Sequence, residues 1–316
     1  MVNISDALAS PTIEAIEAAV IAAEHREFDQ VVRGSSIGVQ CERDLWYRFR
    51  WARWPEQFEG RILRLFDTGH VEERRMIAWL RLAGVNVQDV DPETGDQWEV
   101  ETLGGHFKGH LDGIVAGILE APKTPHLLEC KTHNTKSFTQ LKKHGVAVAK
   151  PEHVAQMQVY MHLRGLPRAF YLAKNKDNDE LYAERVKYDP DQSGRLIAKA
   201  ERIIAADEAP ARINDDPNSF DCRFCPSKGL CHDGEGLLRN CRTCLHSSPV
   251  SSGDWHCGRH NKTLSRDDQY AGCPNHLFLP SLIEGEQVDA DPKAETVSYR
   301  MADGSTWVDG QKGGAA

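Results

Sequence analysis

Hydrophobic and polar residues are distributed differently in successive parts of the chain. Three stretches of helix-favouring composition predict helices at residues 11–25, about 38–54 and about 57–83; the first has a proline near its start and the last ends before a glycine. The next segment consists of short β-rich runs between turn residues, which predict strands of one sheet. These runs are VNVQDV, WEVETLG, HFKGHLDGIVAGIL and HLLECKTH.

Further along, the pattern predicts helices at 136–146, 151–164 and 190–206, and two strands in AFYLAK and ELYAERVKY around the turn NKDND. From residue 207 the composition shifts towards Asp, Pro, Asn and Cys. Order there must come from bound metal or disulfides rather than from a large apolar core. Near the end, a strand pair in ETVSYRM and STWVDG precedes a Gly-rich terminus that we expect to be disordered.

The composition of the chain also bears on its cellular compartment and on the state of its cysteines. No run approaches the roughly 20 apolar residues of a membrane span, and the N-terminus lacks a secretory pattern, so we expect a cytoplasmic protein without membrane association. Seven of the nine cysteines lie between residues 222 and 273, and such clustering indicates metal sites rather than disulfides.

The net charge of −9 conceals a basic region, because residues 121–176 hold ten Lys or Arg and only two Glu. Residues 43–64 add arginines interleaved with aromatic residues. This combination suits stacking on single-stranded nucleic acid, and the alternative is an ordinary solvated helix face.

Two carboxylates and a lysine form the sharpest chemical pattern. Asp112 lies in GHLDG, and Glu129, Cys130 and Lys131 follow in HLLECKTH. Residues i and i+2 of a strand share a face, so Glu129 and Lys131 point one way and Cys130 the other. Carboxylates at adjacent strand ends can hold the divalent cations that phosphodiester hydrolysis needs, and the ammonium can orient water and stabilise the transition state. The alternative is a turn aspartate beside a surface ion pair.

The order of these elements resembles the RecB-type branch of the PD-(D/E)XK nucleases, which includes the AddB nuclease and the CRISPR-associated exonucleases. The resemblance implies an α/β restriction-endonuclease-like core, a central mixed sheet flanked by helices, with Mg²⁺ or Mn²⁺ as cofactor. It implies that His70 on an upstream helix joins the metal shell and that the carbonyl of Cys130 contacts metal. It also implies that Gln156 and Tyr160, one turn apart on a helix, lie near the DNA and the catalytic lysine.

The cysteines fall into two sets. Three clustered thiols and one distant thiol can complete a four-sulfur site for zinc or for an iron–sulfur cluster. These are Cys222, Cys225, Cys231 and Cys41. The resemblance favours a 4Fe-4S cluster with a structural role, because iron–sulfur members of the family have one cysteine before the nuclease motifs and three after.

The second cysteine set has a spacing consistent with a small zinc-binding module, and several histidines are alternative ligands. The cysteines are Cys241, Cys244, Cys257 and Cys273, and the histidines are His246, His256, His260 and His276. The alternative is a loop region with reduced thiols. The resemblance does not extend to this module.

The patterns together predict a nuclease domain at residues 1–235 closed by the iron–sulfur cluster, a zinc module at 236–280 and a partly disordered tail at 281–316. We expect a DNA exonuclease acting on ends or single strands in recombination, repair or phage replication. A structure-specific endonuclease and a non-catalytic DNA-binding adaptor are the alternatives, and the intact Asp112, Glu129 and Lys131 set argues against the adaptor. No P-loop motif is present, so unwinding would need a partner helicase or recombination protein.

Overall fold

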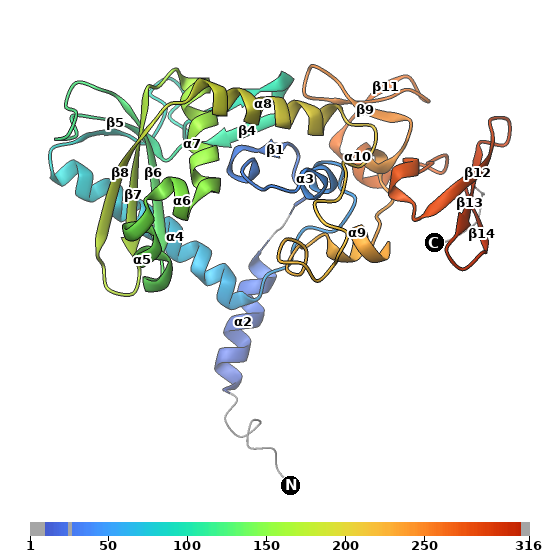
Figure 1. The fold of residues 1–316 in the computed structure, drawn as a ribbon, viewed down its shortest axis with the longest axis horizontal. Coiled ribbons are helices and arrows are strands. Elements are labelled where there is room, and N and C mark those ends of the chain that lie inside the picture. The colour runs from blue at the N-terminus through green and yellow to red at the C-terminus, as the bar shows by residue number, and fades with distance from the viewer. Residues whose placement is uncertain (1–9, 25–26, 311–316) are drawn as a thin grey trace, which may run out of the picture. The chain divides into compact units, whose positions relative to one another are not determined.

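The computed structural model describes residues 10–24 and 27–310, which fall into two compact units. Unit 1 consists of Met1–Glu27, Pro55–Glu99 and His110–Asp189; unit 2 consists of Phe28–Trp54, Val100–Gly109 and Pro190–Ala316. The extreme N-terminus and the Gly-rich end that we expected to be disordered lie outside the described residues. Figure 1 shows the ribbon of both units with most of their helices and strands labelled.

Unit 1 is built on a five-stranded sheet with the order β2-β5-β6-β7-β8. The β6–β7 pair is parallel and the other pairs are antiparallel. The strands are β2 (Asn86–Gln88), β5 (Gly113–Ala116), β6 (His126–His133), β7 (Arg168–Asn175) and β8 (Leu181–Lys187). The helices are α2 (Pro11–Ala23), α4 (Gly60–Leu82), α5 (Thr135–His144), α6 (Val146–Ala149) and α7 (Pro151–Arg164). A mixed sheet flanked by helices confirms the predicted α/β fold (Figure 1).

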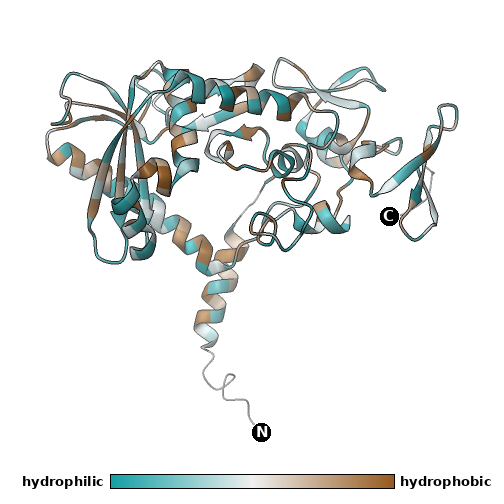
Figure 2. Ribbon diagram, in the orientation of Figure 1, coloured by the Kyte–Doolittle hydropathy of each residue, from teal (hydrophilic) through white to brown (hydrophobic). Residues whose placement is uncertain are grey.

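The core of unit 1 lies between α4 and one face of this sheet. Met76 and Ile77 of α4 belong to one buried cluster with Leu128 and Cys130 of β6 and Leu172 of β7. Hydrophobic residues recur along α4 in Figure 2, as expected for a helix that buries one side. Because strand side chains alternate, Cys130 faces this core and the side chains of Glu129 and Lys131 face the other way, as the pattern predicted.

The prediction of a single sheet was wrong. β4 (Phe107–His110) lies between β1 (Val32–Arg33) and β3 (Glu99–Thr102) and pairs with both in a separate three-stranded sheet. The run HFKGHLDGIVAGIL is interrupted at Leu111 and Asp112, so its first half forms β4 and its second half forms β5. Sequence composition marks both halves as strands, but pairing is decided by contacts between distant residues.

Unit 2 joins helices to two small antiparallel sheets. Its helices are α3 (Glu42–Phe49), α8 (Pro190–Ala205), α9 (Lys228–Asp233) and α10 (Arg266–Ala271). Its sheets contain β9 (Ser247–Pro249), β10 (Trp255–Cys257) and β11 (Lys262–Leu264), and β12 (Gly285–Asp291), β13 (Thr296–Met301) and β14 (Thr306–Asp309). The β13–β14 pair confirms the predicted strand pair near the end, and β12 adds a third strand that the pattern did not predict.

The arginine- and aromatic-rich segment of unit 2 is mostly core, contrary to the stacking surface we expected. Trp46, Phe49 and Trp51 are at most 1% exposed, whereas Trp54 is 65% exposed. The guanidinium of Arg242 lies 3.9 Å from the ring centre of Trp51 and 4.7 Å from that of Trp255, and such cation–π contacts let charged groups share an aromatic core.

Among the described residues, no helix has the length and apolar character to cross a bilayer.

Candidate active site

The three residues of the carboxylate and lysine pattern meet at the junction of β5 and β6 in unit 1. Gly113 pairs with Leu128, which places Asp112, just before β5, beside Glu129. The backbone N–H of Cys130 donates to the Asp112 Oδ2 atom at 2.6 Å, and a charged acceptor makes such a bond strong. The Glu129 carboxylate is fully buried and forms an ion pair with the Lys131 ammonium, whose side chain is 29% exposed. The predicted trio therefore converges.

Gly113 explains why the chain can turn at Asp112. Its φ is 152°, a conformation that L side chains rarely adopt. A Cβ atom there would lie 2.9 Å from the Gln88 carbonyl oxygen of the neighbouring strand. Only glycine therefore allows β5 to pair closely with β2 while Asp112 bends towards β6.

Crowding of negative charge shapes the electrostatics of this junction. Burial, together with the charges of Asp112 and Glu73, raises the pKa of Glu129 to about 7, although Lys131 opposes the rise. Burial acts to lower the pKa of Lys131, but the adjacent Glu129 and Asp112 carboxylates hold it above its ordinary range. Lys131 is therefore a cation that lies close to the carboxylates of Glu129 and Asp112.

Glu73 of α4 is a candidate that the sequence reasoning missed. Burial and the charge of Asp112 raise its pKa to about 7, and the charge of Lys131 acts in the opposite direction, so its carboxyl lies close to both. His70, the helical residue we predicted as a metal ligand, is exposed and lies three residues earlier on α4. The spacing i, i+3 places both on one helix face. The run HVEE could have suggested Glu73, but helical spacing alone did not show which of its two acids lies close to Asp112.

Helix α7 supplies the remaining predicted residues. The Gln156 side-chain amide donates from Nε2 to the Glu129 Oε2 atom at 3.1 Å, and Gln156 itself is 7% exposed. Tyr160 follows one turn later and is 1% exposed, and burial raises the pKa of its hydroxyl above the ordinary value. Gln156 therefore orients the central carboxylate, and Tyr160 lines the same side of the helix.

The donor set at this junction suits a hard divalent cation. Three carboxylates, from Glu73, Asp112 and Glu129, repel one another, with Lys131 among them. Oxygen ligands of this kind are those that Mg²⁺ and Mn²⁺ prefer, and an ion between the acids would relieve their repulsion.

The first cysteine set comes together in unit 2. All four thiols line one pocket, although Cys41 lies far from the other three in sequence. The four are Cys41, Cys222, Cys225 and Cys231. Burial raises the pKa of Cys225 to about 11, and the charges of Asp44 and Cys41 add to this rise. Thiols gathered from distant segments are the arrangement that a four-sulfur site requires.

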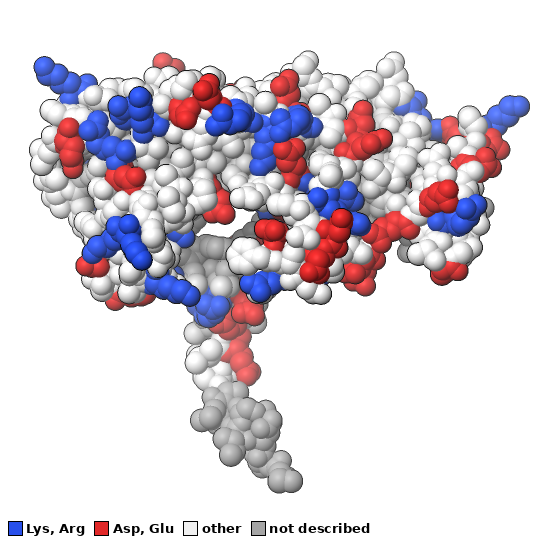
Figure 3. Space-filling model, viewed as in Figure 1, with Lys and Arg blue, Asp and Glu red and all other residues white. Residues whose placement is uncertain are grey.

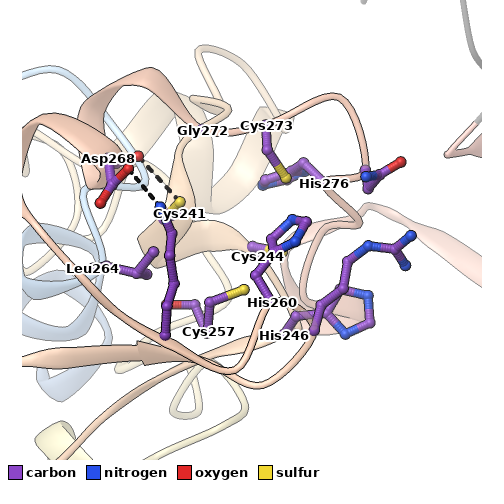
Figure 4. Close-up of a pocket in the computed structure, with 14 residues that line it drawn as sticks. Cys241, Cys244, His246, Cys257, His260, Leu264, Asp268, Gly272, Cys273 and His276 are labelled. Atoms are coloured by element: carbon purple, nitrogen blue, oxygen red, sulfur yellow. Dashed lines mark hydrogen bonds and ion pairs between the residues drawn. The ribbon is translucent and has the colours of Figure 1, made fainter.

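The second cysteine set lines another pocket of unit 2, shown in Figure 4. Cys241, Cys244, Cys257 and Cys273 surround it together with His246, His260 and His276; His256 is not among the lining residues. Burial raises the pKa of Cys241 to about 12, and the other three thiols of the set contribute. Within the part of the chain that the structure describes, however, no three His, Cys, Asp or Glu side chains are arranged as they stand to hold a metal ion.

The model of the PD-(D/E)XK nuclease superfamily matches residues 7–232. The chain is similar to two structures of the alkaline exonuclease LHK-Exo from Laribacter hongkongensis, one of them in complex with dAMP, with 18% identity. For the dAMP complex the TM-score is 0.42, over 61% of this chain and 91% of that one. It is also similar to SSO0001, with 14% identity and a TM-score of 0.42, over 72% of this chain and 98% of that one. No curated protein matches the chain.

Proposed function

Because the chain belongs to the PD-(D/E)XK nuclease superfamily, whose members typically use Mg²⁺ or Mn²⁺, we propose that it is a metal-dependent deoxyribonuclease that digests DNA from ends or along single strands. The observation that carries the proposal is the convergence of Asp112, Glu129 and Lys131 beside a second acid, Glu73. The end or single-strand preference rests on the RecB-type order of the motifs, with recombination, repair or phage replication as the setting.

Each side chain has a role that follows from its position. Asp112 and Glu129 would hold the divalent cation, with Glu73 or His70 of α4 and the Cys130 carbonyl as further ligands. When bound, that ion supplies Lewis-acid activation of water and charge neutralisation at the phosphate. Lys131 places its ammonium where it can orient the attacking water and stabilise the developing negative charge. Gln156 and Tyr160 keep the Glu129 carboxylate and its surroundings in one arrangement.

We also propose two metal centres in unit 2. The pocket that gathers Cys41 with three later thiols supports a structural 4Fe-4S cluster, and the pocket of Cys241, Cys244, Cys257 and Cys273 supports zinc. Cluster or zinc binding requires a rearrangement of these side chains, because among the described residues no three of them are arranged to hold a metal ion. Iron, sulfide and zinc analysis of anaerobically purified protein tests both. Cys41→Ser is expected to remove iron and leave zinc, whereas Cys257→Ser should do the reverse.

Isosteric substitutions test the catalytic assignment. Asp112→Asn, Glu129→Gln and Lys131→Met should each lower metal-dependent DNA hydrolysis by about 10²-fold to 10³-fold or more, the range for loss of one electrostatic stabiliser. Glu180→Gln and Lys187→Met are matched controls on exposed residues of the same unit. Thermal melting must show that all five variants fold. Cleavage at the control rate in the three site variants would contradict the assignment.

The mode of digestion is tested separately with linear and circular DNA. We expect end-labelled linear strands to be degraded with Mg²⁺ or Mn²⁺ and circles to resist. Cleavage of circles at a comparable rate would favour the structure-specific endonuclease. Binding of both forms without any cleavage would favour the non-catalytic adaptor. Stimulation on blunt duplexes by an added helicase or recombination protein would identify the kind of partner.

A further inference from the structure

A chain of buried hydrogen bonds continues from the catalytic strand into α7. The Tyr171 hydroxyl of β7 lies 2.9 Å from His133 Nε2 and 2.9 Å from His153 Nδ1. The Ser137 hydroxyl lies 3.2 Å from His133 Nδ1, and the two imidazole rings stack with centroids 6.0 Å apart. The catalytic role of Lys131 uses none of these groups, so the network needs another explanation.

The surroundings of this network are cationic. Burial first, and then the ammonium groups of Lys131 and Lys150, lower the pKa of His133 to about 4 and that of His153 to about 3. Lys150 lies at the first turn of α7, where its carbonyl accepts from the His153 N–H. The backbone N–H of Lys176 donates to the His133 carbonyl at 2.9 Å, which places that lysine beside the pair as well.

Lys131 is ion-paired with Glu129, but none of the acids that the structure describes is among the groups that shift the pKa of either imidazole, so an anion close to the two rings would be stabilised. Like charges repel, and the N-terminus of the 14-residue helix α7 adds its partial positive charge to those of the lysines. Glu152, in the first turn of α7, is the acid nearest in sequence, but it is exposed and does not perturb either imidazole. Figure 3 shows lysine and arginine side chains gathered around α5 in this unit.

Spacing along β6 relates the network to the catalytic residues. Glu129, Lys131 and His133 are successive residues on one strand face, each about 6.6 Å from the next. That interval is comparable to the distance between neighbouring phosphates of an extended nucleic-acid strand. A strand whose scissile phosphate meets Lys131 would therefore carry its next phosphate to the level of His133.

We propose that His153, supported by Tyr171 and His133 and flanked by Lys150, binds a second, non-scissile phosphate of the substrate strand. The hydrogen-bond chain can run from Ser137 through His133 and Tyr171 to His153 Nδ1, which fixes the tautomer with a proton on Nε2. That Nε2–H lies on the ring edge away from Tyr171 and donates to a phosphate oxygen. This site rests on the proposed nuclease function. It implies that the protein binds the substrate strand at two successive phosphates, the scissile one near Lys131 and the next one at His153.

Binding measured without metal separates this inference from catalysis. In EDTA, the full-length protein binds a labelled single-stranded oligonucleotide, followed by fluorescence anisotropy. His153→Gln should raise Kd about tenfold or more, as expected for a lost bond to a charged group. Lys150→Gln should reduce the slope of log K against log salt by about 0.7, the value for one phosphate contact on a single strand. His162→Gln is the matched control, because it removes another histidine–tyrosine pair of α7, with Tyr188 at 2.7 Å.

An uncharged substrate identifies the contact as phosphate. With methylphosphonate linkages in place of phosphodiesters, the difference between wild type and His153→Gln should disappear. Tyr171→Phe, checked for folding by thermal melting, should weaken binding of the charged strand by a smaller factor than His153→Gln. Unchanged Kd for His153→Gln, or a loss that persists on the uncharged strand, would overturn the proposal. If binding depends on phosphate as expected but no metal-dependent cleavage occurs, the result would contradict the nuclease assignment and leave the phosphate site intact.

Discussion

Metal binding at the carboxylate junction should release protons, and the size of the effect follows from the structure. The pKa values of Glu129 and Glu73 are both raised to about 7, by burial first and then by neighbouring acids. A carboxyl must lose its proton before it can bind a cation. Between about pH 8 and pH 6, each carboxyl therefore weakens apparent ion affinity by about tenfold, and the two together by up to about 100-fold.

The same shifts determine how the metal-free fold responds to pH. Both folded-state pKa values lie above the ordinary glutamate value near 4.3. The stability contributed by these groups is therefore complete below about pH 4.3 and is lost as the pH rises through about 7. A bound ion reverses this trend, because it favours the ionised form. Added Mn²⁺ should thus raise the melting temperature more at about pH 8 than at about pH 6.

Calorimetric titration with Mn²⁺ in two buffers of different ionisation enthalpy counts the protons directly. Because each carboxyl is about half protonated at pH 7, we expect wild type to release about one proton there, and Glu73→Gln to release about half a proton and to show a shallower dependence of Kd on pH. Glu180→Gln, an exposed acid of the same unit, should behave as wild type. Ion affinity that stays constant from pH 6 to pH 8, with no proton release, would refute the idea that these two carboxyls are the ligands.

Three further changes test the scaffold around the site. Gly113→Ala should destabilise the protein by more than about 1 kcal/mol and lower nuclease activity, because the added Cβ meets the neighbouring strand; urea unfolding and hydrolysis rates measure the two effects. Lys174→Met should cost about 3 kcal/mol, since Lys174 is 3% exposed and ion-paired to Glu72, whereas the exposed Lys142→Met should change unfolding by less than about 0.5 kcal/mol. Chelators should lower the melting temperature of wild type and leave that of Cys257→Ser unchanged, if zinc orders unit 2.

The sequence was most informative where local chemistry decides structure. The run HLLECKTH predicted a strand at 126–133 and α7 was predicted at 151–164, and both agree with the structure to the residue. The first is a buried run whose alternation sorts side chains between two faces, and the second begins at a proline, which is favoured in the first helical turn. The face shared by Glu129 and Lys131 follows from strand geometry alone, so the heart of the candidate site could be predicted.

Features that depend on distant contacts could not be predicted in the same way. Arg50 belongs to a segment whose arginines and aromatic residues suggested a nucleic-acid surface, yet it is 0% exposed. Its guanidinium lies 5.0 Å from the ring centre of Trp255, some two hundred residues away in sequence. A segment rich in arginine and aromatic residues fits both a nucleic-acid-binding surface and a buried core with cation–π contacts, so its composition does not distinguish the two. Glu73 was overlooked for a similar reason, because its raised pKa comes from burial and from the charge of Asp112, and both depend on other elements of the fold.

The two faces of strand β6 have different roles, since one packs in the apolar core and the other carries candidate catalytic residues. Leu128 and Cys130 anchor α4 through the apolar core, whereas Glu129 and Lys131 on the other face meet α7, through Gln156. Its neighbours complete the site from both sides, since Asp112 immediately precedes β5 and Tyr171 of β7 supplies the hydroxyl that links the two histidines. A substitution on the core face should therefore move stability first and ion affinity little, while one on the other face should do the opposite, which allows fold and catalysis to be tested independently within one strand.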